Sequence, residues 1–199
     1  MLIVVSDAAF HKNEPALLNE MFDQGLEFFH LRKPSAPASA LQHLIEKIKP
    51  QHISKIALHS HHQLANIFRM NRLHYTEVKR KKSNPMEWQA LKESGCHLST
   101  SVHQIQEAAK LPGSFDYAFL GPVFDSISKQ GYSSTISKKI KMPKNKTKLI
   151  AIGGINEINL KLSFEMGFDG IAILGAIWQS TDPVKSFQLI KKACSSIVP

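Results

Sequence analysis

The sequence contains little cysteine: two residues, Cys96 and Cys194, in a chain of 199. They lie far apart and fit neither C-x-x-C nor another metal-ligand spacing, which excludes a metal site built on cysteine pairs. Apolar or helical pattern flanks each of them, so reduced and buried thiols are expected.

Long apolar runs are also missing. No stretch approaches the roughly 18 consecutive apolar residues of a membrane span. The chain starts directly with the apolar run LIVVS, without a charged and then apolar leader, so a secretory signal is not expected. We expect a soluble, cytoplasmic protein with no membrane partner.

Acidic residues are scarce relative to basic ones. Lys and Arg number 25 against 16 Asp and Glu, which gives a net charge of +9 and a pI of about 9.6. This excess favours anionic partners, whether phosphorylated metabolites, nucleic acid or membrane headgroups. The two basic clusters, residues 79–82 and 138–148, contain no interleaved aromatic residues for base stacking. A small anionic molecule is therefore expected rather than nucleic acid.

The sequence does contain a regular alternation of short apolar runs and longer segments with helical spacing. Strands are expected at residues 2–6, 26–31, 55–59, 72–76, 95–99, 117–121, 148–152 and 170–174. Helices are expected near residues 14–25, 36–48, 61–70, 85–94, 101–110, 155–166 and 182–195. The polar, lysine-rich segment 133–146 is only arguably helical.

This alternation predicts an α/β fold with a parallel sheet. The runs are apolar throughout, which is typical of strands covered on both faces. Eight strand–helix units in a chain of this length favour a single (β/α)₈ barrel domain over residues 1–199, with a doubly wound open sheet as the alternative. In a barrel, the functional residues lie at the carboxyl ends of the strands.

The second strand ends in HLRKP, with His30 and Arg32 on one face. An Arg at a strand end offers a planar cation that suits phosphate oxygens, although it can also pair with a neighbouring acid. The third strand ends in LHSHH, where His59, His61 and His62 invite a metal hypothesis. No Asp, Glu or Cys lies within a few residues. We therefore expect a polar pocket lining and no metal site.

The fifth and sixth strands are followed by hydroxyl-rich segments. In HLSTSVHQIQEA, Ser99 to Ser101 are expected to cap the next helix, with Gln104 as capping-box partner and His103 near the barrel mouth. In GPVFDSISKQG, Ser126, Ser128 and Lys129 suit a loop that closes over a phosphate-bearing substrate. An ordinary solvated loop is the alternative.

The last two strands end in glycine turns. LIAIGGIN ends in Gly153 and Gly154, and AILGAIW places Gly175 at the next turn. Glycine lets backbone amides approach an anion without a Cβ in the way. Barrels often bind phosphate with the loops after strands seven and eight. These glycines therefore predict a phosphate-binding cradle.

The motifs HLRKP, HLSTSVHQIQEA, DYAFLGPVFDSISK, LIAIGGIN and GFDGIAILGAIW, in this order and spacing, resemble the thiamin-phosphate synthase family, including its TenI-like thiazole tautomerase branch. The resemblance covers nearly the whole chain and is strongest from residue 95 to 178. It implies a barrel transferase of thiamin biosynthesis that condenses hydroxymethylpyrimidine pyrophosphate with thiazole phosphate, giving thiamin phosphate and pyrophosphate. Its partners would be these small phosphorylated substrates. A homodimer is compatible, because family members often dimerise.

The resemblance also implies roles for individual residues. Arg32 corresponds to an arginine that contacts pyrophosphate, and Ser101 corresponds to a hydroxyl contact before the fifth helix. The closing loop corresponds to Ser126, Ser128 and Lys129. The cradle for the thiazole phosphate corresponds to Gly153 and Gly154 with the backbone of Leu174 and Gly175.

Several positions depart from the family pattern. His30 replaces a glutamine, and Pro34 occupies the place of a lysine, although Lys33 is adjacent. The Asn-Asp pair expected after the third strand reads His59-Ser60, and a further aspartate aligns roughly with Lys79. Those acids hold Mg²⁺ in the synthases, and Mg²⁺ prefers oxygen ligands. We expect this chain not to use that Mg²⁺ site, and no other cofactor is indicated.

The departures leave other functions open. A thiazole phosphate tautomerase needs a general acid and base but no metal, and His30, His59 or His103 would have to serve. The position after the sixth-strand glycine is Pro122, as in synthases, which favours the synthase reading. The remaining alternatives are a non-catalytic barrel that binds phosphate ligands, a nucleic-acid binder, and another phosphate-handling isomerase.

Overall fold

The computed structural model of this chain describes residues 1–124 and 146–197. The sequence predictions for Ser126, Ser128 and Lys129 lie outside the described residues. The same holds for most of the basic cluster 138–148.

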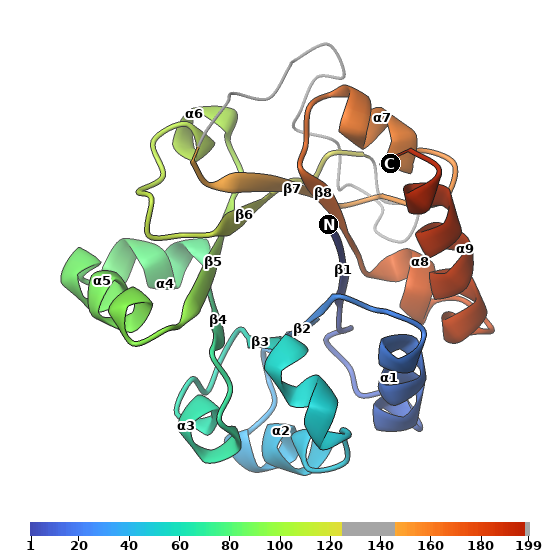
Figure 1. The fold of residues 1–199 in the computed structure, drawn as a ribbon, viewed down its shortest axis with the longest axis horizontal. Coiled ribbons are helices and arrows are strands. Elements are labelled where there is room, and N and C mark those ends of the chain that lie inside the picture. The colour runs from blue at the N-terminus through green and yellow to red at the C-terminus, as the bar shows by residue number, and fades with distance from the viewer. Residues whose placement is uncertain (125–145, 198–199) are drawn as a thin grey trace.

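Parallel strands close into a barrel in chain order, from β1 round to β8 and back to β1 (Figure 1). The strands are β1 (Leu2–Val5), β2 (Phe28–Leu31), β3 (Ile56–Leu58), β4 (Arg72–Tyr75), β5 (His97–Val102), β6 (Tyr117–Leu120), β7 (Lys148–Ile152) and β8 (Gly170–Ile173). Every neighbouring pair is parallel. The prediction of a (β/α)₈ barrel is confirmed, and the open sheet is wrong.

Helices surround the barrel on its outer side (Figure 1). They are α1 (Glu14–Asp23), α2 (Ala38–Ile45), α3 (Leu64–Phe68), α4 (Glu77–Lys82), α5 (Pro85–Glu93), α6 (Ile105–Ala108), α7 (Leu160–Glu165), α8 (Gly175–Trp178) and α9 (Pro183–Ser195), with a 3₁₀ turn at Pro50–Lys55. Proline in the first turn suits the starts of α1, α5 and α9.

The core has two layers because alternate strand residues face opposite ways. Along β1, Leu2 and Val4 pack into the layer between the barrel and the helices. Ile3 and Val5 belong to a smaller cluster with Tyr117, Phe119, Ile150 and Ala172. That cluster lies inside the barrel, so other strand residues at inward positions also face the barrel interior.

The structure corrects the reading of the fifth strand. β5 continues through Ser99 and Ser101 to Val102, so these serines are strand residues and do not cap a helix. The following helix, α6, begins only at Ile105, and Gln104 before it makes no side-chain capping bond. A hydroxyl residue can lie in a buried strand when a side chain on the neighbouring strand forms a hydrogen bond with it. Here that neighbour is His74 of β4, which contacts both serines.

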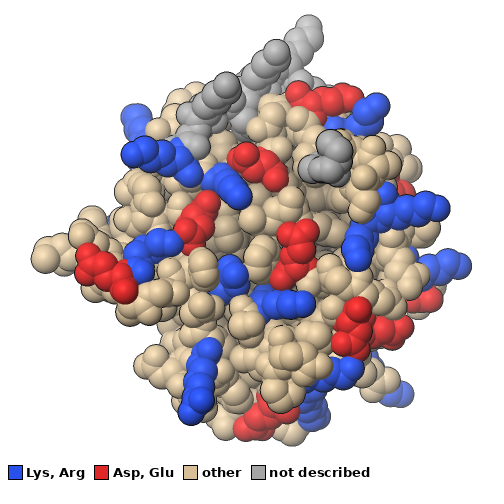
Figure 2. All heavy atoms as spheres, viewed as in Figure 1, with Lys and Arg blue, Asp and Glu red and all other residues tan. Residues whose placement is uncertain are grey.

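The basic cluster 79–82 forms most of helix α4, which the sequence reading missed. Thr76 caps it by accepting a hydrogen bond from the Lys79 amide. Lys81 pairs with Glu77 one turn earlier and with Glu107 from α6 at 2.9 Å. On the face shown in Figure 2, basic and acidic side chains are intermingled. Within this cluster, Arg80 and Lys81 thus lie beside acidic side chains.

Both cysteines are free thiols, as expected, but each is only partly buried. Burial raises the pKa of the Cys194 thiol to about 11.

Within the part of the chain that the structure describes, no helix has the length and apolar character needed to cross a bilayer.

Candidate functional site

Three histidines form the polar centre of the barrel. His30 lies in β2, His74 lies in β4, and His59 directly follows β3. His30 and His74 are fully buried, and 9% of the surface of His59 is exposed. One ring nitrogen from each lies within 4.8 Å of one from each of the others. The barrel therefore joins residues 30, 59 and 74 into one group.

Hydrogen bonds fix most of these rings. His30 Nδ1 lies 2.8 Å from His59 Nε2, and His30 Nε2 lies 2.6 Å from the hydroxyl of Tyr117. His74 contacts Ser99 through Nδ1 and Ser101 through Nε2, each at 2.9 Å. The rings of His59 and His74 stack with their centroids 3.9 Å apart.

The environment keeps these rings neutral. Burial, with a smaller effect from Arg72, lowers the pKa of His30 to about 3. Burial also lowers the pKa of His59 and of His74 well below the usual range, and neighbouring histidines add to the effect. Since both nitrogens of His30 are engaged inside the barrel, the prediction that His30 exchanges a proton with substrate finds no support in this arrangement.

The second strand places its two basic residues differently. Arg32 is exposed just after β2, and its backbone N–H and C=O both bond to the Ser6 hydroxyl, at 2.7 and 2.9 Å. Lys33 is fully buried, and its ammonium lies 2.8 Å from Glu14 Oε2 and 2.6 Å from the Ala9 carbonyl. Arg32 is thus available at the barrel mouth, whereas Lys33 holds the loop before α1.

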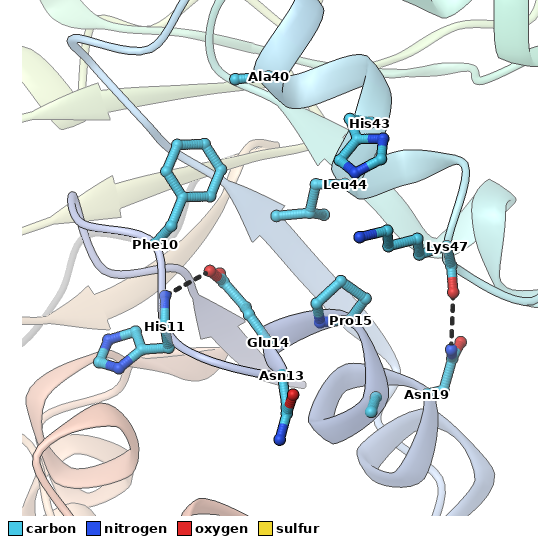
Figure 3. A pocket seen from close by; sticks show the side chains of 11 residues that line it. Phe10, His11, Asn13, Glu14, Pro15, Asn19, Ala40, His43, Leu44 and Lys47 are labelled. Atoms are coloured by element: carbon cyan, nitrogen blue, oxygen red, sulfur yellow. Dashed lines mark hydrogen bonds between the residues drawn. The ribbon is translucent and has the colours of Figure 1, made fainter.

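The neighbourhood of Glu14 is hollow, with a cavity of about 430 Å³ between that loop, α1 and α2 (Figure 3). Phe10 and Glu14 line one side of it, and His43, Leu44 and Lys47 line the other. None of the lining residues belongs to the histidine group or to the glycine turns. This cavity lies outside the barrel and is separate from the predicted site.

The glycine turns after β7 and β8 are partly exposed. Gly153 and Gly154 have φ of +97° and +66°, a conformation that side chains on L-residues disfavour. Both are partly exposed, as are Leu174 and Gly175. Among the described residues, no backbone acceptor is bonded to the amides of Gly154 and Gly175. The arrangement leaves these N–H groups able to bind an anion.

The remaining predicted residues divide between the mouth and the interior. His103 lies just after β5, largely exposed, with Nδ1 3.0 Å from the Gly121 carbonyl and Nε2 3.5 Å from a Glu77 carboxylate oxygen. Ser101 contacts His74 and is partly buried. Of the three histidines predicted as site residues, His30, His59 and His103, it is His103 that is largely exposed to solvent.

The donors do not fit a magnesium ion at the positions where the resemblance implies acidic ligands. His59 supplies nitrogen, and the Lys79 ammonium lies 2.9 Å from His62 Nδ1 and 4.9 Å from the centre of the Tyr75 ring. Burial lowers the pKa of Lys79, and burial with the nearby ammonium lowers that of His62 to about 4. Magnesium requires oxygen ligands, and these residues offer nitrogen and a cation.

The sequence reading missed His74, Ser99 and Tyr117 as members of this centre. The sequence feature that could have indicated them is a polar or hydroxyl residue inside an apolar strand, such as the histidine of RLHY in β4. A polar residue on an inward strand position needs a buried partner, which only the closed barrel identifies.

Comparisons with known proteins point to one family. A family model described as thiamine monophosphate synthase matches residues 1–177. The thiamine-phosphate synthases of Anoxybacillus flavithermus and Listeria welshimeri are 40% identical over 86 residues and 37% identical over 91 residues. These matches cover 41% and 43% of this chain, and only 40% and 44% of the two relatives.

Solved structures extend the likeness to the whole chain. A thiamine phosphate pyrophosphorylase from Bacteroides thetaiotaomicron is 27% identical with a TM-score of 0.79, covering 98% of this chain and 97% of that one. One from Pyrococcus furiosus is 20% identical with a TM-score of 0.74, covering 100% and 96%, and supports the fold alone.

Proposed function

Because this chain belongs to the thiamine monophosphate synthase family, we propose that it joins hydroxymethylpyrimidine pyrophosphate to thiazole phosphate, forming thiamin phosphate and pyrophosphate. The C–O bond to pyrophosphate breaks and its electron pair leaves with the pyrophosphate. The thiazole nitrogen then forms the new C–N bond with the pyrimidine methylene carbon. The protein's task is to align the two reactants and to stabilise the departing charge.

The observation that carries the proposal is the pair of glycine turns after β7 and β8. The amides of Gly154 and Gly175 have no backbone acceptor among the described residues, and both glycines are partly exposed. Bare amides at this end of a barrel suit a phosphoryl group. In our proposal they hold the thiazole phosphate.

Positive charge for the leaving pyrophosphate is assigned to Arg32 and Lys79. Arg32 is exposed after β2, and Lys79 follows β4 in α4. A guanidinium and an ammonium both stabilise phosphate oxygens, the first through paired hydrogen bonds. We therefore propose that the reaction does not use the family's acidic Mg²⁺ site. Ser126, Ser128 and Lys129 retain their predicted role in closing the site.

The test is a synthase assay with both substrates, following thiamin phosphate. Arg32→Ala is expected to lower kcat/KM for the pyrophosphate substrate about 10- to 100-fold, because a charge-assisted contact contributes about 1.5–3 kcal/mol. Arg69→Asn is the matched control, since Arg69 is exposed at the end of α3 with φ of +53°, which Asn tolerates. Equal rates for both variants and the unaltered protein would contradict the role of Arg32.

Treatment with a chelator tests the expected independence of Mg²⁺ without testing the synthase function itself. EDTA is expected to leave the synthase rate unchanged. If EDTA abolished the rate and Mg²⁺ alone restored it, the proposed charge substitution would be wrong while the synthase function would stand.

A phosphate-binding barrel without synthase activity is the second candidate, and the nitrogen and ammonium groups in place of magnesium's acids favour it. If the protein is such a binder, we expect its Tm to rise with thiazole phosphate but not with pyrophosphate. A ligand at 100 times its Kd stabilises by about 2.7 kcal/mol. Conversion of a thiazole phosphate isomer without the pyrimidine substrate would instead identify a tautomerase, and we would assign the proton transfer to His103, which is exposed just after β5.

We also propose a cytoplasmic location, which suits the two free thiols, and retain the homodimer as an expectation. Size-exclusion chromatography with light scattering tests the dimer.

A further inference from the structure

The histidine group inside the barrel has the composition of a metal site. We propose that His30, His59 and His74 bind a divalent transition-metal ion of the Zn²⁺ or Co²⁺ class. The proposal goes beyond the synthase reaction and does not depend on it. It also differs from the sequence prediction, which placed the metal hypothesis on His59, His61 and His62 and expected no metal.

The ring nitrogens lie close to the spacing that such an ion needs. Zinc binds imidazole at about 2.0–2.1 Å, so two ligand nitrogens in a tetrahedral site lie about 3.4 Å apart. His30 Nδ1 and His59 Nε2 lie 2.8 Å apart, and all three ligand atoms lie within 4.8 Å of one another. Ion binding would therefore require the rings to rotate so that the first distance opens and the longer ones close.

The partners of the rings also suit coordination. A metal-bound imidazole donates its other N–H to a neighbouring acceptor, which fixes the ring. Tyr117 lies 2.6 Å from His30 Nε2, and Ser99 lies 2.9 Å from His74 Nδ1. These contacts leave His30 Nδ1 and His74 Nε2 to face the ion. Binding through His74 Nε2 replaces only its contact with the partly buried Ser101.

His59 completes the set in either of two ways. Its Nε2 faces His30, and its Nδ1 is buried without a hydrogen-bond partner among the described residues. His59 is also the one member with some exposure, at 9%, so it marks the side from which an ion enters. An unpaired buried nitrogen beside two further imidazoles is a reason to expect a ligand there.

The surroundings decide the kind of ion. The rings lie beside Phe119, whose centroid is 4.6 Å from that of His30 and 5.1 Å from that of His74. Within the described residues, the group includes no carboxylate. Nitrogen-only donors favour Co²⁺, Cu²⁺ or Zn²⁺ over Mg²⁺ or Ca²⁺.

The experiment uses the full chain without a histidine tag, treated with a chelator and then titrated. Isothermal titration with Zn²⁺ is expected to give one ion per chain, and Co²⁺ to give the intense visible bands of a tetrahedral complex. His59→Gln and His74→Gln are expected to weaken Zn²⁺ binding at least about tenfold. His43→Gln on the exposed surface of α2 is the matched control and is expected to bind normally.

Folding of each variant is checked by circular dichroism in EDTA. If either variant is unfolded, the unaltered protein still decides the question through its Co²⁺ spectrum and its Zn²⁺-dependent Tm. Weak octahedral Co²⁺ bands, no Zn²⁺ shift, or equal binding by His59→Gln and His43→Gln would overturn the site. None of these measurements uses a thiamin precursor, so a failure here and a failure of the synthase proposal are distinguishable.

Discussion

Lys33 and Glu14 form a buried ion pair, with Nζ and Oε2 2.8 Å apart and side-chain exposures of 0% and 1%. Lys33 also donates to the Ala9 carbonyl at 2.6 Å, and Glu14 Oε2 accepts from the His11 amide at 3.2 Å. The pair therefore fastens the end of β2 to the start of α1. By this contact the pair supports the loop that follows β2 and the loop that precedes α1.

Replacing one member of this pair is expected to destabilise the protein strongly. Lys33→Met leaves the Glu14 carboxylate buried without its cation, which costs about 3–5 kcal/mol of unfolding free energy. Urea denaturation at pH 7 measures the loss. The double variant Lys33→Met with Glu14→Gln is expected to recover much of it, because the uncompensated charge is gone. Equal losses in the single and double variants would show that the charge is not the cause.

Acid is expected to destabilise the metal-free protein well before its carboxylates titrate. Burial lowers the pKa of His30 to about 3 and of His62 to about 4, and it lowers those of His59 and His74 well below the usual value. Below pH 6.5 the unfolded chain therefore takes up protons that the folded chain does not. The stability present above pH 6.5 is lost as the pH falls toward 3, by up to about 1.4 kcal/mol per pH unit for each histidine.

Urea midpoints between pH 8 and 5 in EDTA measure this effect. The midpoint is expected to be flat from pH 8 to 7 and to fall below pH 6.5. By contrast, the hydrogen bond from Lys81 lowers the pKa of Glu77, so such carboxylates contribute only under more acidic conditions. A midpoint that stayed constant down to pH 5 would contradict the burial of neutral histidines.

The sequence was sufficient for the barrel and for the glycine turns. The run of β7 has Leu149, Ile150 and Ala151 buried, and a short continuous apolar run of this kind indicates a strand covered on both faces without tertiary information. Gly153 and Gly154 form the turn predicted after β7, and both have positive φ. Local chemistry determines both features, so local patterns indicate them.

The histidine group could not be assembled from sequence, because its contacts are distant along the chain. His30 meets His59 after 29 residues and Tyr117 after 87. Their partnership depends on barrel closure and on the register of neighbouring strands. The same limit explains Lys33, which looked available for phosphate until the fold placed Glu14 beside it.

The two tryptophans offer a matched test of one hydrogen bond beside the glycine turn that precedes α8. Trp178 in α8 donates from Nε1 to the Val5 carbonyl at 2.7 Å. Trp88 is equally buried, but its Nε1 has no partner among the described residues. Trp178→Phe leaves the carbonyl unpaired, so it is expected to cost about 1–3 kcal/mol more than Trp88→Phe. Urea denaturation of both variants measures the difference, and equal losses would contradict it.

Gly153 is the glycine at which a single methyl group is expected to damage the turn after β7. A Cβ there would lie 2.8 Å from both Cα and Cβ of Pro122, and φ of +97° already disfavours an L-residue. Gly153→Ala is therefore expected to cost about 2 kcal/mol or more. Because the turn carries the Gly154 amide, the thermal shift produced by thiazole phosphate should shrink as well.

Gly113→Ala is the control for this substitution, since its Cβ would meet only the flexible Lys146 side chain at 3.9 Å. Restricting the unfolded chain at such a position is neutral or stabilising by up to about 1 kcal/mol. The control should keep its full response to thiazole phosphate. If Gly153→Ala lost stability but bound thiazole phosphate normally, the turn would be structural and the phosphate would have to be held elsewhere. If both variants behaved alike, the close approach to Pro122 would not be what requires glycine at position 153.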